Sequence, residues 1–175
     1  LHGTNEFPFL IGDEGISVLP ITSLALNHQV SNERIATGIP RLDAMLGGKG
    51  FFRGSSILLT GTPGTGKTIV AANFAQAAAR RGERVLFFSF EESPDQIIRN
   101  MHSIGLRLAP LVQRGRLRFH SARPSLYGLE MHLATMFKEI ATFQPQVVVI
   151  DPITSLMDSG TDSETKGMIT RLIDY

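Results

Sequence analysis

The chain has 175 residues, of which 42% are hydrophobic, 19% charged and 7% aromatic; this is typical of one globular domain and excludes disordered and collagen-like chains. Its 17 Lys and Arg against 16 Asp and Glu leave a net charge of +1, so overall charge does not indicate nucleic-acid or membrane-surface binding. The absence of cysteine excludes disulfides, thiolate zinc sites and cysteine nucleophiles.

The first part of the chain has an irregular pattern. No Lys or Arg occurs before residue 34, and prolines and glycines interrupt short apolar pieces such as Phe7–Ile11 and Ile16–Leu19. This pattern predicts an irregular or strand-like segment and not a helix. Because such apolar pieces have to pack against something else, we interpret residues 1–30 as a linker from a preceding domain, and residues 31–175 as the part that folds regularly.

Beyond residue 34, predicted strands and helices alternate. Short apolar runs predict strands at 56–60, 84–90, 117–121 and 147–150. Helical periodicity and end signals predict helices at 68–81, 94–104, 129 to the Gln144-Pro145 stop, and 162–175. The alternation is typical of an α/β fold with a mostly parallel sheet and helices on both faces. The β-branched run Val147–Ile150 predicts a strand covered on both faces.

A phosphate-binding motif lies between the first of these strands and the first helix. Its residues match the pattern G-x-x-x-x-G-K-[ST]: Gly61, Thr62, Pro63, Gly64, Thr65, Gly66, Lys67 and Thr68. The glycines let several N–H groups converge on one anion, and the helix start adds its positive dipole end. Lys67 would bridge the β- and γ-phosphates of ATP, and the Thr68 hydroxyl would coordinate Mg²⁺. The alternative is a glycine-rich turn with an exposed lysine, but the full motif in its proper context favours nucleotide binding.

Acidic residues follow two of the predicted strands. Asp151 ends the run 147–150 and is expected to hold the metal, although it could be an ordinary cap before the Pro152 turn. Glu91 and Glu92 follow the strand at 84–90, and one carboxylate could orient or deprotonate an attacking hydroxyl or water. Adjacent side chains point to different sides, so the two acids can serve different roles. From position alone, a solvated acidic turn is slightly the better interpretation of the pair.

Together these motifs resemble the RecA-like P-loop ATPases and, among them, most closely the KaiC family of circadian clock proteins. The residues that carry the resemblance are Thr37–Asp43, Leu46–Gly48, Gly54, the loop at 61–68, Phe88–Ser93 and Val147–Asp151. The resemblance covers the chain from about residue 31 onward. It implies that Glu91 is the general base with Glu92 as its companion, that Lys67 and Thr68 serve the phosphates and Mg²⁺, and that Asp151 is the second acid on the metal side.

The resemblance also implies a domain that continues past Tyr175. In this family, the strand that follows the metal-side acid strand inserts beside the phosphate-loop strand, and this strand would lie beyond the present residues. We therefore expect residues 31–175 to be the N-terminal part of the second ATPase domain of a two-domain protein. The autophosphorylated Ser/Thr cluster and most basic residues that act across subunit contacts would lie in the remainder.

The activity that the resemblance implies is Mg-ATP hydrolysis with serine/threonine autokinase activity. It also implies a homo-hexamer with ATP at the subunit interfaces and clock regulators like KaiA and KaiB as partners. One alternative is a DNA-dependent RecA-like recombinase or helicase-type ATPase, whose hydrolysis DNA would stimulate. A second alternative, from a different class, is a nucleotide-gated ring-assembly module with little turnover.

The remaining arginines, histidines and apolar helix residues are interpreted as surface or core residues. The basic stretch from Arg80 to Arg123 lacks interleaved exposed aromatics, and Arg114, Arg116 and Arg118 alternate as on the solvent side of an edge strand, so nucleic-acid binding is not favoured. No carboxylate or cysteine lies at metal-ligand spacing from His102, His120 or His132, so they are interpreted as surface or core histidines. A helix face carries Met131, Met136 and Phe137, which we interpret as core residues. No apolar run approaches the ~18 residues of a membrane-spanning helix, and no secretory leader is evident, so we expect a cytoplasmic protein without a membrane segment.

Overall fold

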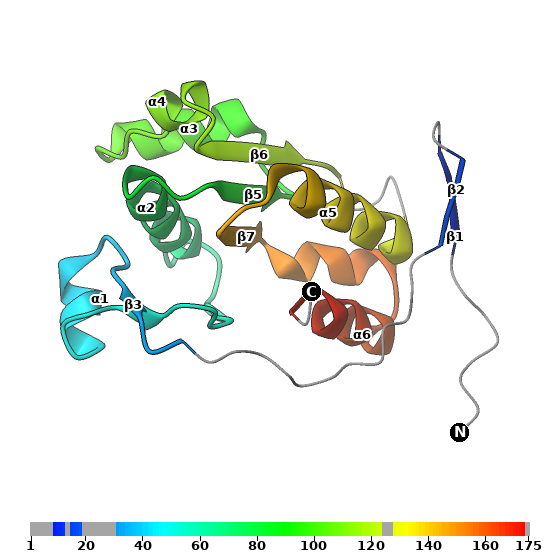
Figure 1. Cartoon of the computed structure of the whole chain (residues 1–175), viewed down its shortest axis with the longest axis horizontal. Helices are drawn as coiled ribbons and strands as arrows, with labels where there is room; N and C mark the ends of the chain where they lie inside the picture. Colours follow the sequence, from blue (N-terminus) through cyan, green and yellow to red (C-terminus); the bar gives the residue numbers. More distant parts are fainter. Residues whose placement is uncertain (1–8, 13–14, 19–30, 124–127, 174–175) are drawn as a thin grey trace.

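A parallel three-stranded sheet forms the centre of the protein. The computed structural model describes residues 9–12, 15–18, 31–123 and 128–173. The strands are β5 (Val85–Ser89), β6 (Leu117–Ser121) and β7 (Val147–Asp151), in the order β6-β5-β7 (Figure 1). Ser89 at the end of β5 is in register with Ser121 and with Asp151, so the three strands end along one edge. The prediction of a parallel α/β sheet is confirmed.

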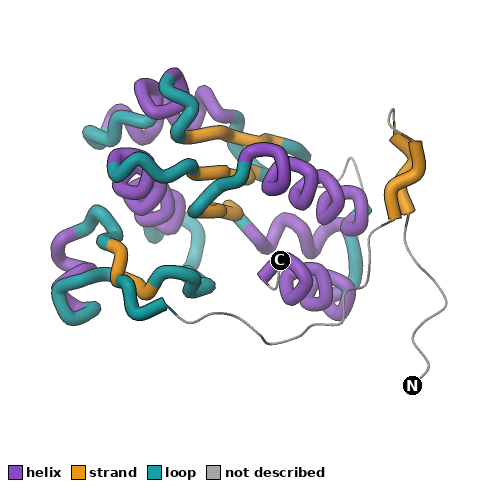
Figure 2. The backbone as a smooth tube through the Cα atoms, viewed as in Figure 1, coloured by secondary structure: helices purple, strands orange, loops and turns teal. Residues whose placement is uncertain are grey.

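Helices cover both faces of this sheet, as predicted. One face carries α2 (Lys67–Arg80), α3 (Pro94–Ser103) and α4 (Ala109–Gln113), and the other carries α5 (Leu129–Phe143), the 3-10 helix η2 (Ile153–Ser159) and α6 (Asp162–Ile173) (Figure 2). The central strand β5 is buried throughout: Val85 and Phe87 pack in the core of the first face, and Leu86 and Phe88 in that of the second. Alternate side chains of one strand therefore join two hydrophobic layers.

Helix ends follow their local sequence signals closely. At the start of α3, Ser93 Oγ accepts a hydrogen bond from the Gln96 N–H at 3.3 Å, and the Gln96 side chain accepts from the Ser93 N–H at 2.8 Å. This capping box, followed by Pro94 in the first turn, satisfies backbone donors that the helix itself leaves unpaired. α2 and α3 begin and end within one residue of the predicted bounds, and α6 begins at the predicted residue.

The predicted strand at 56–60 is wrong. These residues form neither strand nor helix, and Ile57, Leu58 and Leu59 are 47%, 73% and 45% exposed. A strand requires a hydrogen-bonded neighbour, and within the described part of the chain β7 pairs with β5 alone while 56–60 pairs with nothing. The expectation that the run 147–150 is covered on both faces is also wrong at Val148, which is 39% exposed.

A small unit that the sequence did not predict precedes the phosphate loop. It comprises β3 (Arg34–Ile35), α1 (Pro40–Met45) and β4 (Phe51–Phe52), with β3 and β4 paired antiparallel. The Arg34 guanidinium lies 4.1 Å from the centre of the Phe52 ring. Gly50 is required beside this pair, because a Cβ at that position would lie 2.1 Å from the Ile35 carbonyl oxygen.

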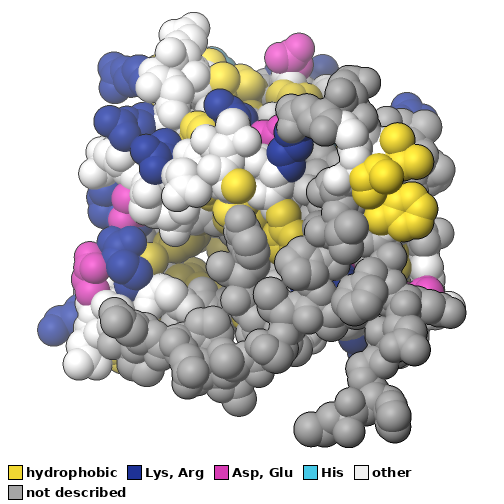
Figure 3. All heavy atoms as spheres, turned by 45° about the vertical axis from the view of Figure 1, so that its right-hand side comes forward, with side chains coloured by type: hydrophobic (Ala, Val, Ile, Leu, Met, Phe, Trp, Pro, Cys, Tyr) yellow, Lys and Arg dark blue, Asp and Glu magenta, His cyan; other side chains and the backbone are white. Residues whose placement is uncertain are grey.

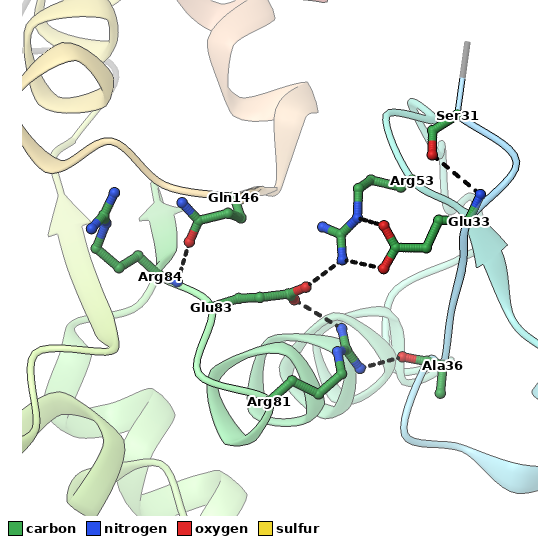
Figure 4. A network of polar contacts seen from close by, with 8 residues as sticks. All are labelled: Ser31, Glu33, Ala36, Arg53, Arg81, Glu83, Arg84 and Gln146. Atoms are coloured by element: carbon green, nitrogen blue, oxygen red, sulfur yellow. Dashed lines mark hydrogen bonds and ion pairs between the residues drawn. The ribbon is translucent and has the colours of Figure 1, made fainter.

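An ionic network fastens this unit to the carboxyl end of α2 (Figure 4). Arg53 donates to the carboxylates of Glu33 and Glu83, and Arg81 donates to Glu83 at 3.0 Å and to the Ala36 carbonyl at 2.9 Å. The hydrogen bonds from Arg53 hold the pKa of the Glu33 carboxyl below its ordinary value, and the two carboxylates raise the pKa of Arg53. Both arginines therefore join the residues that flank β3 to the end of α2.

Two short strands lie in the N-terminal segment. β1 (Phe9–Gly12) and β2 (Gly15–Val18) pair antiparallel, which agrees with the prediction of strand-like structure and not a helix. The rest of the proposed linker 1–30 lies outside the described residues. Among the described residues, no helix is both long enough and apolar enough to cross a bilayer.

Candidate nucleotide-binding site

Two glycines of the loop at 61–68 adopt backbone conformations that other residues rarely adopt. Gly66 is the N-cap of α2 and has φ 89° and ψ 19°, in the left-handed region, and Gly64 has φ 84°. At Gly61, a Cβ would lie 2.7 Å from Thr65 Oγ1, whose hydroxyl donates to the Thr62 carbonyl at 2.8 Å. Residues 61–65 are exposed. Backbone N–H groups at an exposed helix start are suited to bind an anion.

Lys67 lies folded against the loop. Its ammonium donates to the carbonyls of Gly61 at 2.8 Å and Thr62 at 3.0 Å. Phosphate oxygens are stronger acceptors for an ammonium than neutral carbonyls, because the hydrogen bond then joins opposite charges. An anion bound at the loop would therefore offer the Lys67 ammonium a stronger acceptor than these two carbonyls.

The two expected metal-side residues lie on neighbouring elements. Thr68 is the second residue of α2, and Asp151 ends β7. Ala72 and Ala75 of α2 share a core with Val147 of β7, so the helix that starts at the loop packs against the strand that ends in Asp151 (Figure 1). A hydroxyl and a carboxylate are hard oxygen ligands of the kind that Mg²⁺ accepts, together with phosphate oxygens and water.

Direct contacts between the loop and the acids are not formed in the part of the chain that the structure describes. There, no hydrogen bond or ion pair joins residues 61–68 to Glu91, Glu92 or Asp151. In the whole described part of the chain, no three or more His, Cys, Asp or Glu side chains form a cluster that could hold a metal. Among the described residues, Thr68 and Asp151 remain the two candidate ligands that the sequence indicated.

The two adjacent glutamates turn to different neighbours. Glu91 Oε1 accepts a hydrogen bond from Ser155 Oγ at 3.0 Å, on the η2 segment that follows Asp151. Glu92 Oε1 accepts from Asn100 Nδ2 on α3 at 3.1 Å. β5 and β7 are adjacent in register, and the Phe90 N–H donates to the Asp151 carbonyl at 3.1 Å. Glu91 therefore lies on the Asp151 side of the sheet edge, and Glu92 lies on the α3 side.

A hollow of about 220 Å³ opens at the carboxyl ends of β5 and β6. Its lining includes Glu91, Glu92, Ser121 and Arg123. Sequence reasoning did not single out Ser155, Asn100 or Arg123 as individual site residues. Only the position of Ser155 shortly after Asp151 could have drawn attention to it, since no motif marks that serine.

The basic residues near β6 make contacts within the chain. Within the described residues β6 is an edge strand, as expected, but of the three arginines behind that expectation only Arg118 lies in β6, while Arg114 and Arg116 precede it. Arg116 donates to the Gly82 carbonyl at 2.8 Å, and Arg118 lies 4.3 Å from the centre of the Phe143 ring and 3.6 Å from a Glu139 oxygen. On the face drawn in Figure 3, acidic side chains lie among the basic ones.

The histidines lie against aromatic and acidic side chains. His120 lies 4.0 Å from a Glu139 oxygen and its ring centre is 5.5 Å from that of Phe88, while buried His132 makes an edge contact with Phe90 at 5.7 Å. Met136 is buried in the core of the second face, and Phe137 is partly buried against it, as expected. These contacts assign His120 and His132 to packing.

Comparisons with known proteins agree on one family. A family model described as "ATPase: KaiC" matches residues 35–175. The "Circadian clock protein KaiC2" of Synechocystis sp. is 56% identical over 174 residues, which are 99% of this chain and 31% of that protein. The "Circadian clock oscillator protein KaiC" of Parasynechococcus marenigrum is 42% identical, and that of Thermostichus vulcanus 43%, each over 89% of this chain and 30% of the relative. The chain thus spans about a third of the length of these relatives.

Proposed function

Because the chain belongs to the KaiC family of RecA-like circadian clock ATPases, we propose that its loop at 61–68 binds Mg-ATP and that the domain transfers the γ-phosphoryl group to water. One observation carries this proposal: the glycine-shaped loop starts a helix that packs against the strand ending in Asp151. The cradle for phosphate and the acid for the metal thus belong to elements in direct contact.

Each residue of the site has a distinct role in the proposed reaction. Lys67 exchanges its two loop carbonyls for β- and γ-phosphate oxygens and stabilises the charge that develops on them. Bound Mg²⁺ would neutralise phosphate charge and orient the γ-phosphoryl group. Thr68 would ligate the ion, and Asp151 would hold it directly or through water. Glu91 accepts the proton of the attacking water, for which its exposed carboxylate is suited.

The wider activity proposed here rests on the family resemblance. It consists of serine/threonine autokinase activity, a homo-hexameric ring with ATP at its interfaces, and regulation by partners like KaiA and KaiB. In this proposal, residues 1–30 are a linker and residues 31–175 the N-terminal part of an ATPase domain within a longer protein. The exposed, unpaired segment at 56–60 supports an additional strand contributed by that longer protein.

The test is Glu91→Gln in the intact protein, with Asp95→Asn as a control at an exposed acid of α3. Glu91→Gln preserves side-chain shape but removes the base, so ATP binding should persist while turnover falls by ~10² or more. Asp95→Asn should leave both unchanged. Retained turnover in Glu91→Gln would refute its role, and Glu92→Gln would then show whether its neighbour acts instead.

Two further measurements separate the alternatives. Stimulation of hydrolysis by DNA would favour a DNA-dependent RecA-like motor. Ring formation with ATP but negligible turnover would favour a nucleotide-gated assembly module. The proposal expects turnover that does not depend on DNA.

A further inference from the structure

Ser155 makes a contact that its own segment does not require. It lies in η2, is only 8% exposed, and its hydroxyl donates to Glu91 Oε1 at 3.0 Å across 64 residues of sequence. A serine in a helical turn can instead bond to a nearby backbone carbonyl of its own segment. Here the hydroxyl points away from η2, toward the candidate base.

Without this hydrogen bond, the Glu91 carboxylate would have no fixed orientation. Within the described part of the chain, no other hydrogen bond or ion pair reaches that carboxylate, and Glu91 is exposed. The backbone beside it is held separately, since buried Ser89 donates from its hydroxyl to the Glu92 carbonyl at 2.6 Å. Ser89 therefore fixes the turn, whereas Ser155 fixes the side chain.

We propose that Ser155 is a positioning residue for Glu91: its hydroxyl holds Oε1 and leaves Oε2 to accept the proton of the attacking water. The proposal rests on the proposed function of Glu91 as the base. A base is effective only when the accepting oxygen stays within hydrogen-bond reach of the proton it removes. A glutamate with three rotatable bonds spends less time in that geometry once its anchor is lost.

The experiment measures steady-state ATP hydrolysis of the intact protein with Ser155→Ala. We expect kcat to fall about tenfold with KM for ATP within about twofold, because the lost contact acts on the chemical step and not on binding. Ser155→Thr retains the hydroxyl and should recover most of the loss. Thr154→Ala is the matched control, since it removes an exposed hydroxyl from the same segment and should leave kcat unchanged.

A double-mutant cycle with Glu91→Gln separates positioning from a structural role. If Ser155 acts through Glu91, then Ser155→Ala should not lower turnover further in the Glu91→Gln background. An equal loss in both backgrounds, or an unchanged kcat in Ser155→Ala alone, would overturn the proposal. Should the alanine variant not fold, Ser155→Cys provides a side chain of similar size with a much weaker donor, and it should show the same kcat loss at an unchanged melting temperature.

The outcomes also distinguish this proposal from the proposed function. Normal turnover in Glu91→Gln would refute the role of the base itself. A large loss in Glu91→Gln with full activity in Ser155→Ala would refute the positioning role alone.

Discussion

Gly66 offers a sharp test of how the loop binds nucleotide. Its φ of 89° lies in the left-handed region, where a side chain costs ~1–2 kcal/mol. A Cβ placed there would lie 3.9 Å from Ile69 Cδ1, which is ordinary contact distance. Gly66→Ala therefore introduces backbone strain without a steric clash.

The strain in Gly66→Ala should appear mainly as lost affinity. Residues 61–65, which precede Gly66, are exposed and can relax in the free loop, whereas a loop whose N–H groups converge on phosphate cannot. A difference of ~1–2 kcal/mol between the two states corresponds to roughly 5- to 30-fold weaker ATP binding. Isothermal titration of the intact protein with Mg-ATP measures this change, and thermal unfolding should show little loss of stability.

Gly105→Ala is the matched control. Gly105 has φ 90°, and a Cβ there would meet nothing within 4 Å. Its turn is anchored, because the Gly105 N–H donates to the His102 carbonyl at 3.1 Å and the N–H of buried Leu106 donates to the Met101 carbonyl at 2.9 Å. The same ~1–2 kcal/mol should therefore lower the free energy of unfolding and leave ATP affinity unchanged. Wild-type ATP affinity in Gly66→Ala alongside destabilised Gly105→Ala would refute the reasoning about the loop.

Three further predictions concern binding, stability and assembly. Lys67→Ala should weaken ATP binding by at least about 100-fold, because the charge on the β- and γ-phosphates is lost; unchanged equilibrium binding would contradict the phosphate-loop assignment. Ser93→Ala removes the cap of α3 and should lower the free energy of unfolding in urea by about 1 kcal/mol, and an unaltered midpoint would mean that the cap contributes nothing. In sedimentation with saturating Mg-ATP, the intact protein should run as a hexamer and the 175-residue chain should not; a monomeric intact protein would contradict the ring.

Sequence predicted the elements whose signals are local. Ser93, Pro94 and Gln96 signal the start of α3 within four residues, and the glycines of the phosphate loop lie within one short motif. β3 and β4 have two residues each, which is too short for periodicity to detect. The strand predicted at 56–60 failed because an apolar run becomes a strand only beside a partner, and its pattern does not encode that partner.

In the candidate site, too, residues marked by local motifs could be predicted, whereas contacts between distant positions could not. Lys67, Thr68 and Asp151 could be chosen from motif and position, since each follows or precedes a recognisable run. The contact between Glu91 and Ser155 joins positions 64 residues apart, so only the packing of η2 against the end of β5 brings them together. The divergence of Glu91 from Glu92 was expected from their adjacency, but their partners were not.

The unpaired side of β7 has a consequence for handling the protein. Its outward backbone groups have no partner among the described residues, and Val148 beside them is 39% exposed. The apolar side chains of Ile57, Leu58 and Leu59, in another part of the chain, are also exposed. Open β-edges with exposed apolar side chains act as templates on which other chains add strands. At high concentration, the 175-residue chain is therefore expected to self-associate through intermolecular β-pairing at β7, and Val148→Lys is the substitution that should raise its solubility most directly.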